Sequence, residues 1–384
     1  MKSKSFRIAI IDPVGSKAGM DHYDTILAEG IQQAGSASVV FSNYPANDAS
    51  GIIHQTFHNT GKGKYASLLR SLSGMKSSLD EARDWKADFI LLHVFRGGLI
   101  DFLFFLMVRM YGFRIIALVH DVESLESYSL PLFRRTVLGQ LSTLRIVHNA
   151  FSREQLFHTL QPSNRFPVTV IPHVHFLSLF SNHDKSNRHS SWPAELVKPS
   201  GTERITLLFF GQIKRSKGLD VLLEAMRDIP DHIHLIIAGK TRDTDPLSIK
   251  RSIDDAGLAS RVQTVLRHIS DAERDTLFNT CDMLVLPYRR IYQSGVLLMG
   301  MSAGIPVVAS DLEPNRDAVI HERTGLMFQS GNAAALRDSL MIMASDKAIR
   351  NRYSEQARMH IRESHDPLKA ARLLIDALNQ LPPS

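Results

Sequence analysis

The feature that most constrains the fold is an alternation of short apolar runs with helical patterns, which begins near the N-terminus. Tyr23 to Ala34 predicts a helix, with Ile26, Leu27 and Ile31 on one face. Strands that alternate with helices indicate βαβ units and a parallel sheet. The predicted strands of this first half are Arg7–Ile11, Phe89–Val94, Arg114–Val119, Thr143–Val147 and Val168–Ile171.

A second alternation occupies the other half of the chain. Lys217–Arg227 predicts a helix whose apolar residues recur at helical spacing. Ser270 to Asn279 predicts another, because Ser270 and Glu273 have capping-box spacing. A third helix is expected to begin near Ser294, and the tail from Ala333 onward is mostly helical in pattern. The predicted strands are Ile205–Phe210, His234–Ala238, Val262–Val265, Met283–Leu286 and Pro306–Ala309.

Two successive halves of this kind predict an α/β protein of two facing, doubly wound, Rossmann-like domains. The polar segment 181–203, rich in Ser, Asn and Pro, is expected to be the linker between a domain of residues 1–180 and one of residues 204–364. A C-terminal helix within 365–384 is expected to join the first domain. Because open parallel sheets bind ligands at the carboxyl ends of their strands, a cleft between the domains is the expected site.

Composition agrees with two globular cores. The chain has 384 residues, of which 44% are hydrophobic and 22% charged. Its one cysteine, Cys281, excludes an internal disulfide framework and favours a reducing, cytoplasmic compartment. The N-terminal residues read as a first strand and not as a signal peptide. The apolar run Leu99–Val108 is too short to span a membrane and predicts a core helix, or a helix that dips into a bilayer surface.

The charge balance bears on partners. A net charge of +6 is compatible with anionic lipid or polyphosphate substrates, and peripheral contact with the inner face of a membrane is a hypothesis. The excess is too small and scattered for nucleic-acid binding, and no aromatic-basic interleaving typical of single-strand binders is present.

Specific motifs lie in the second half. They are Phe209–Asp220, with Gly211 after a strand and Lys217-Gly218 before a helix; Asp282–Tyr288; Ser294-Gly295-Val296 followed by Gly304–Ser310; and Thr324–Phe328. Their order and spacing resemble glycosyltransferase family 4, which has the GT-B fold. Weaker likenesses in the first half are Ala117–Asp121, Ile171-Pro172-His173, and Gly15 and Gly19 after the first strand.

The resemblance implies transfer of a hexose from a UDP- or GDP-linked sugar to a saccharide or lipid-linked acceptor, with retention of configuration, in surface polysaccharide or glycolipid assembly. It implies no cofactor and no metal. Fixed cations and a helix N-terminus would neutralise the departing diphosphate. Lys214 and Lys217 are the predicted cations, and the predicted helix start at Ser294 and Gly295 offers N–H groups to a phosphate. Gly211, Tyr288, Gln293 and Val296 complete the predicted donor site.

In the first half, the resemblance places His120 against the donor sugar near the reacting carbon, with Asp121 beside it. Gly15 and Gly19 would form a glycine loop on the acceptor side. The alternative for His120 is a purely structural role, as a core histidine bonded to a backbone carbonyl. For Lys214 and Lys217 it is a solvated basic turn.

One departure from the family stands out. Its usual pair of glutamates, eight residues apart, falls here at Ile291 and Met299, which cannot bond a ribose or sugar hydroxyl. A catalytically inactive homologue that binds a nucleotide sugar or a partner transferase is therefore an alternative. A phosphorylase or epimerase of the same fold is a further one. Asp243-Thr244-Asp245 looks like a metal-binding DxD motif, but its position before Pro246 predicts a turn and helix cap.

Overall fold

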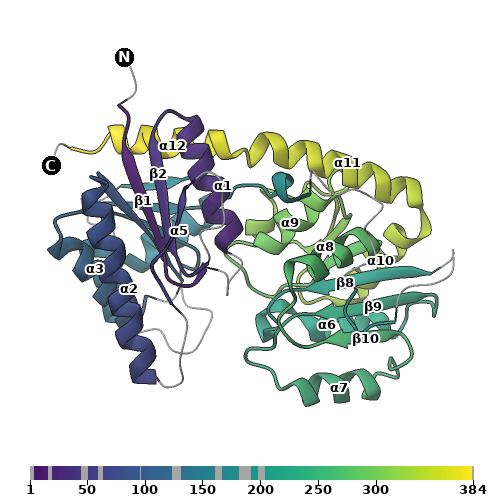
Figure 1. Ribbon diagram of the computed structural model, residues 1–384. Helices are drawn as coiled ribbons and strands as arrows, with labels where there is room; N and C mark the ends of the chain where they lie inside the picture. The colour runs from purple at the N-terminus through teal and green to yellow at the C-terminus, as the bar shows by residue number, and fades with distance from the viewer. Residues whose placement is uncertain are drawn as a thin grey trace. The chain divides into compact units, whose positions relative to one another are not determined.

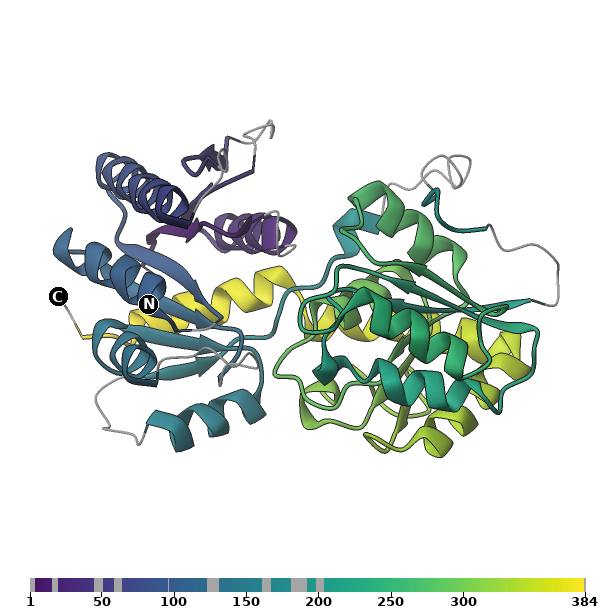
Figure 2. The same cartoon turned by 90° about the horizontal axis from the view of Figure 1, so that it is seen from below.

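The computed structural model describes residues 4–15, 20–44, 51–58, 64–95, 97–122, 131–160, 167–180, 192–197 and 204–382. The chain forms two compact units. The first consists of Met1–Val174 with His365–Ser384, and the second of His175–Ser364. Each unit contains one parallel β-sheet with packed helices, so the predicted pair of Rossmann-like α/β domains is confirmed (Figures 1 and 2). Gly19, predicted as part of a glycine loop, lies outside the described residues.

The sheet of the first unit has seven strands in the order β3-β2-β1-β4-β5-β6-β7. The predicted apolar runs are all strands. β1, β4, β5 and β6 are almost wholly buried, as strands inside a parallel sheet require, whereas the edge strand β7 is half-buried. Two strands were not predicted: β2 carries serines among its apolar residues, and β3 is partly exposed. The strands are β1 (Arg7–Asp12), β2 (Ala37–Ser42), β3 (Ile53–Gln55), β4 (Phe89–Val94), β5 (Arg114–Val119), β6 (Leu144–Val147) and β7 (Val168–Val170).

Helix α12 belongs to the first unit although it lies at the end of the chain. It runs beside α1 (Figure 1), and the approach is close, because a Cβ at Gly30 would lie 2.6 Å from the carbonyl oxygen of Pro367. The helices of this unit are α1 (Met20–Gln33), α2 (Lys64–Asp84), α3 (Leu99–Met110), α4 (Pro131–Thr136) with the π-helical turn η2 (Val137–Leu141), α5 (Ala150–Leu160) and α12 (Pro367–Asn379).

Helix α3 is the apolar run for which two interpretations were open. Phe104, Phe105 and Val108 are buried against the unit, which confirms a helix that packs on the core. Leu99, Ile100, Leu106 and Met110 are exposed on the same helix. Within the described part of the chain, no helix is long and apolar enough to cross a bilayer.

The second unit has six parallel strands in the order β10-β9-β8-β11-β12-β13. Its strands are β8 (Ile205–Phe210), β9 (Ile233–Ala238), β10 (Val262–Val265), β11 (Met283–Leu286), β12 (Val307–Ser310) and β13 (Leu326–Phe328). Its helices are α6 (Leu219–Met226), α7 (Pro246–Asp255), α8 (Asp271–Thr280), α9 (Gly295–Ala303), α10 (Ala333–Ser345) and α11 (Lys347–Ser364), with the 3-10 turns η3 (Leu177–Phe180), η5 (Arg215–Lys217) and η6 (Glu313–Asn315).

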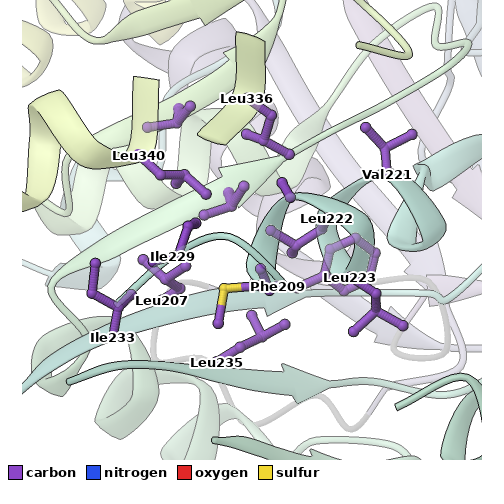
Figure 3. Packing of buried hydrophobic residues seen from close by; sticks show 14 of the residues in the cluster. Leu207, Phe209, Val221, Leu222, Leu223, Ile229, Ile233, Leu235, Leu336 and Leu340 are labelled. Carbon is purple, nitrogen blue, oxygen red and sulfur yellow. The ribbon is translucent and has the colours of Figure 1, made fainter. Parts of the chain in front are cut away.

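The core of the second unit lies between β8, β9 and the helices α6 and α10. Phe209 and Leu207 of β8 belong to one buried cluster with Leu222 of α6 and with Leu336 and Leu340 of α10 (Figure 3). Cys281 is buried, and burial raises the pKa of its thiol above the ordinary value, as expected for a small apolar core residue. This packing fixes the carboxyl ends of β8 and β11, from which the turns that carry Lys217 and Tyr288 emerge.

Part of the expected linker is held on the second unit. Within residues 192–197, Glu195 receives two hydrogen bonds from Arg267, at 2.7 and 2.9 Å, and Val197 N donates to Gln263 Oε1 at 2.6 Å. A bidentate arginine–carboxylate pair fixes geometry as well as charge. The polar composition of 181–203 did not indicate these contacts.

Candidate functional site

The turn after β8 differs in one respect from the sequence prediction. Lys217 was expected to open an α-helix, but it closes the 3-10 turn η5, and α6 begins two residues later at Leu219. The reason is Gly218, which has φ +67° and so cannot continue a right-handed helix. Lys214 is the N-cap of η5, and both lysines are half-buried. The two ammonium groups therefore come from a tight turn and not from a helix.

Gly218 is also the point at which this turn meets the next strand. A Cβ there would lie 1.8 Å from the carbonyl oxygen of Pro287, which directly follows β11. Only glycine tolerates both the left-handed φ and this approach. The Lys217-Gly218 pair is thereby locked beside the carboxyl end of β11.

Three predicted side chains of the second unit form one chain of contacts. The Lys217 ammonium lies over the Tyr288 ring, 3.9 Å from its centroid. The Tyr288 hydroxyl is 3.3 Å from Ser294 Oγ, and burial raises the pKa of this phenol to about 12, so it stays protonated at neutral pH. Ser294 in turn caps α9 by accepting from Leu297 N at 3.2 Å. The cation is thus tied to the helix start.

The start of α9 is suited to an anion. Gly295 and Val296 are its first two residues, and N–H groups at that position have no partner in the helical ladder. They carry the positive end of the helix dipole. Gly211, with φ +108°, lies against this start, since a Cβ there would be 3.2 Å from Val296 Cγ2. Gln293 is half-buried and immediately precedes the cap.

The positions that replace the family's glutamates are apolar in structure as well as in sequence. Ile291 and Met299 are both buried, 6% and 8% exposed. Met299 lies within α9, on the same helix that begins at Ser294. Neither side chain can accept a hydrogen bond from a hydroxyl, so any ribose contact here must come from other groups.

The Asp243–Asp245 segment is a turn and helix cap, as predicted. Asp245 is the N-cap of α7, and its carboxylate accepts from Leu247 N at 3.2 Å. Asp243 accepts from Arg215 N at 3.0 Å, which ties this loop to η5. Both carboxylates therefore have backbone partners that account for their presence.

In the first unit, the predicted glycine Gly15 lies in a tight turn after β1. Its N–H donates to Asp12 Oδ2 at 2.9 Å, and Val14 N donates to Asp12 Oδ1 at 2.8 Å. A Cβ on Gly15 would be 2.5 Å from Ser42 Oγ and from Asn43 Oδ1. The turn is therefore fixed by the buried Asp12 carboxylate and has no room for a side chain.

His120 lies directly after β5, as predicted. Its N–H pairs with Val94 O at 3.0 Å, which continues the β4–β5 ladder by one residue. The imidazole is half-buried and stacks on Phe95, with centroids 4.5 Å apart and planes 8° from parallel. Its Nε2 is 2.8 Å from Nδ1 of His93, so the partner of the side chain among the described residues is another histidine and not a backbone carbonyl. Asp121, its neighbour, accepts from the Arg134 guanidinium through its backbone oxygen.

The sequence reasoning missed that His120 belongs to a row. At the carboxyl ends of β1, β4, β5, β6 and β7, which are adjacent in the sheet, stand Asp12, His93, His120, His148 and His173. Tyr23 of α1 contacts all four histidines edge-on, with centroids between 4.7 and 6.0 Å. The signal was present: a histidine ends or follows each of four apolar runs, and such ends meet at one edge of a parallel sheet.

Buried charge sits behind this row. His93 Nε2 lies 2.8 Å from Asp24 Oδ1, and both side chains are buried. Asp12, Asp24 and His93 each place one ligand-type atom within 4.8 Å of the others. The separation of Asp24 and His93 is short enough for a direct ion pair when His93 is protonated.

The geometry can now be compared with known proteins. Residues 194–360 match the family model of glycosyl transferases group 1. The matched region, the glycosyltransferase group 1 domain, lies within the second unit. The matched residues include the Lys217 turn, Tyr288 and the start of α9, so the candidate anion site lies inside the glycosyltransferase group 1 domain.

Curated glycosyltransferases align with parts of this chain. A GDP-mannose:glycolipid 4-beta-D-mannosyltransferase of Xanthomonas campestris pv. campestris is 33% identical over 122 residues, which cover 31% of this chain and 33% of the relative. A phosphatidyl-myo-inositol mannosyltransferase of Mycobacterium leprae is 30% identical over 38% of this chain and 39% of the relative. These alignments span only about a third of the length of such relatives. A D-inositol 3-phosphate glycosyltransferase of Arthrobacter sp. aligns over 90% of this chain at 23% identity, covering 86% of the relative.

Solved structures extend the likeness to the whole fold. Sucrose-phosphate synthase from Thermosynechococcus elongatus superimposes with a TM-score of 0.73 at 19% identity, covering 98% of this chain and 99% of that one. Anabaena HepE in complex with UDP and glucose gives 0.72 at 16% identity, covering 98% and 100%. The glycosyltransferase group 1 domain and the first unit together therefore have the GT-B fold.

Proposed function

We propose that this protein is a glycosyltransferase that transfers a hexose from a nucleotide sugar to a saccharide or lipid-linked saccharide acceptor. The observation that carries the proposal is the chain of contacts from Lys217 through Tyr288 to Ser294 at the start of α9. It unites a fixed cation, a buried phenol and a helix N-terminus in one place. That combination suits the diphosphate of a nucleotide sugar.

The chemical role of this half-site, made of the Lys217 turn, Tyr288 and the start of α9, is to stabilise the leaving group. As the glycosidic bond breaks, negative charge grows on the diphosphate, and the Lys217 and Lys214 ammonium groups with the α9 N–H groups neutralise it. We propose that these fixed charges serve in place of a divalent metal. Activity that survives complete chelation supports this role, and activity that returns only with added metal contradicts it.

The first unit supplies His120, which we propose contacts the donor sugar. Its place at the carboxyl end of β5 is where open parallel sheets bind ligands. Gly15 lies at the same edge, after β1, and we propose that its turn lies on the acceptor side.

The nucleotide, the acceptor and the stereochemistry are finer parts of the proposal. Anabaena HepE forms complexes with UDP, and the Xanthomonas relative is named for GDP-mannose, so both nucleotides belong in the test. The names of relatives include glycolipid and phosphatidylinositol substrates, which favours a lipid-linked acceptor and peripheral contact with a membrane. We propose retention, as the resemblance to family 4 implies; the proton NMR coupling constant of the product's anomeric centre decides it.

The decisive experiment measures release of nucleoside diphosphate from a panel of UDP- and GDP-sugars with glycolipid acceptors. Acceptor-dependent release with one donor supports the proposal. Binding of a donor without turnover would instead support the alternative, an inactive homologue that binds a nucleotide sugar or a partner transferase. The burial of Ile291 and Met299 is the observation that favours this alternative. Absence of both binding and turnover would contradict both the proposed transferase and the inactive, sugar-binding homologue.

A further inference from the structure

Three side chains from the first unit, of which His120 is the last, form a continuous line. Asp24 comes from α1, His93 from the end of β4, and His120 from the residue after β5. Asp24 Oδ1 lies 2.8 Å from His93 Nε2, and His93 Nδ1 lies 2.8 Å from His120 Nε2. One ring nitrogen of His93 thus lies at ion-pair distance from a carboxylate, and the other lies at hydrogen-bond distance from the second histidine.

Because this line is buried, the protonation states of its three side chains depend on one another. Asp24 is fully buried and His93 nearly so, and the Asp24 oxygens have no well-directed hydrogen-bond donor among the described residues. A buried carboxylate of that kind needs either a proton or a neighbouring positive charge. Burial raises the pKa of Asp24 to about 7, and His93 opposes that rise. Burial alone would lower the pKa of His93, but the charges of Asp24 and Asp12 outweigh it and raise the pKa.

His120 has the opposite tendency. Removal from water, followed by the charges of His93, His148 and His173, lowers the pKa of His120 well below its ordinary value. The contact with His93 agrees, because only one proton can lie between two ring nitrogens 2.8 Å apart. Charge on His93 and neutrality of His120 are thus the mutually consistent assignment.

We propose that Asp24 holds His93 as an imidazolium, and that His93 thereby fixes His120 as the neutral tautomer protonated on Nδ1. The step follows from valence. An imidazolium carries protons on both nitrogens, so His93 Nδ1 donates and His120 Nε2 accepts. A neutral His120 that accepts at Nε2 must carry its one proton on Nδ1.

This inference rests on the proposed function for its consequence, since His120 is the residue proposed to contact the donor sugar. With the tautomer fixed, the remaining nitrogen of His120 is a hydrogen-bond donor, suited to a sugar oxygen. Asp24 and His93 are positioning residues that act through His120. The ring orientation is held as well, by the stack on Phe95 and by the edge of Tyr23, whose centroid is 6.0 Å away.

The test is a two-dimensional nitrogen–proton NMR spectrum of the ligand-free, chelator-treated protein labelled with ¹⁵N-histidine, near pH 7. Single His93→Gln and His120→Gln variants assign the two rings. We expect His93 to show two protonated nitrogens and His120 to show a protonated Nδ1 with an unprotonated Nε2. A wild-type spectrum in which His120 is protonated on Nε2 overturns the proposal, and this result requires no other variant to fold.

The paired variants are Asp24→Asn and, as a control, Asp88→Asn. Asp88 is an exposed carboxylate that bonds Arg7 N at 2.7 Å, at the opposite end of β1. Asp24→Asn is expected to remove the charge from His93 and the single tautomer from His120, whereas Asp88→Asn should change neither. Unchanged His93 and His120 signals in Asp24→Asn contradict the proposal.

Enzyme kinetics add a second readout that distinguishes the two proposals. Outer residues that orient a functional group typically account for about 10- to 100-fold in activity. We expect Asp24→Asn to lower kcat by roughly tenfold with little change in the KM for the donor. A protein with the expected tautomer but no sugar transfer would retain this inference and contradict the proposed function. An altered tautomer in Asp24→Asn with unchanged kcat would contradict the role of the line in positioning.

Discussion

The two units place their candidate functional groups at strand ends by different means. In the second unit the site is made largely by backbone: a glycine turn, a capped helix start and one lysine held over a ring. In the first unit it is made by side chains, as a row of histidines on adjacent strands with a buried carboxylate behind it. A backbone site depends on local conformation and is encoded in a few consecutive residues. A side-chain row depends on the register of a whole sheet.

Replacing Gly218 with alanine is expected to have the largest effect, because it disturbs the backbone turn of the second unit directly. The new Cβ would lie 1.8 Å from Pro287 O, so the backbone would have to move. The alanine would also have to adopt a strained left-handed conformation, with φ near +67°. We expect a loss of roughly 2 to 5 kcal/mol in the free energy of unfolding, measured by urea titration. Gly257→Ala is the matched control, since Gly257 has φ +71° with open space around its Cβ position. It should cost about 1 kcal/mol. Equal losses for the two variants would show that the contact with Pro287 is unimportant.

Removing the cation tests the same half-site without disturbing its backbone. We expect Lys217→Ala to lower kcat for nucleoside diphosphate release by about 100- to 1,000-fold, as loss of one preorganised charge does elsewhere. Lys250→Ala, an exposed lysine of α7 in the same unit, should leave the rate unchanged. A reduction of less than about threefold in Lys217→Ala would remove this residue from the proposed machinery.

The histidine row predicts that the first unit is sensitive to acid. Burial lowers the pKa of His148 to about 4, although the hydrogen bond that its ring donates to Ile171 O partly offsets this effect. A group whose pKa falls on folding stabilises the protein above its unfolded value of about 6.5, and that contribution is lost as pH falls toward 4. Between pH 7.5 and 5, the free energy of unfolding of His148→Asn should therefore fall by about 2 kcal/mol less than that of the wild type. Parallel pH profiles for the variant and the wild type in urea unfolding would contradict the assignment.

The smallest effect is expected at the DxD-like segment. Asp243→Asn keeps an oxygen acceptor for Arg215 N, so stability should change by less than about 0.5 kcal/mol and the rate by less than twofold. The comparison is made in chelator and in added Mn²⁺. A rate that depends on metal in the wild type and is lost in this variant would restore a metal-binding role.

Sequence reasoning did better for the backbone site than for the row. Gly211, Lys217, Tyr288, Ser294 and Gly295 lie in three short segments whose turn and cap chemistry is local, and the structure brings them together. The helix start was misplaced because the left-handed conformation of Gly218 interrupts a helical pattern without altering its apolar spacing.

For the first unit, the strands β4 and β5 were predicted to the residue, and His120 was singled out. Asp24 was read as part of a helix, and His93 as part of a strand. Their contact depends on how α1 packs on the sheet, which no local pattern contains. Strand β2 was missed for the related reason that Ser38 and Ser42 point to tertiary partners, Ala28 O and Asp12 O.

The most direct test of the central claim measures thermal unfolding with and without nucleotide sugars. Saturating donor should raise the unfolding midpoint of the wild type, because a ligand that binds only the folded state stabilises it. The account predicts that one UDP- or GDP-sugar gives this shift, that Lys217→Ala loses it, and that Lys250→Ala keeps it. No shift with any donor, or an equal shift in Lys217→Ala, would contradict a diphosphate site at this turn.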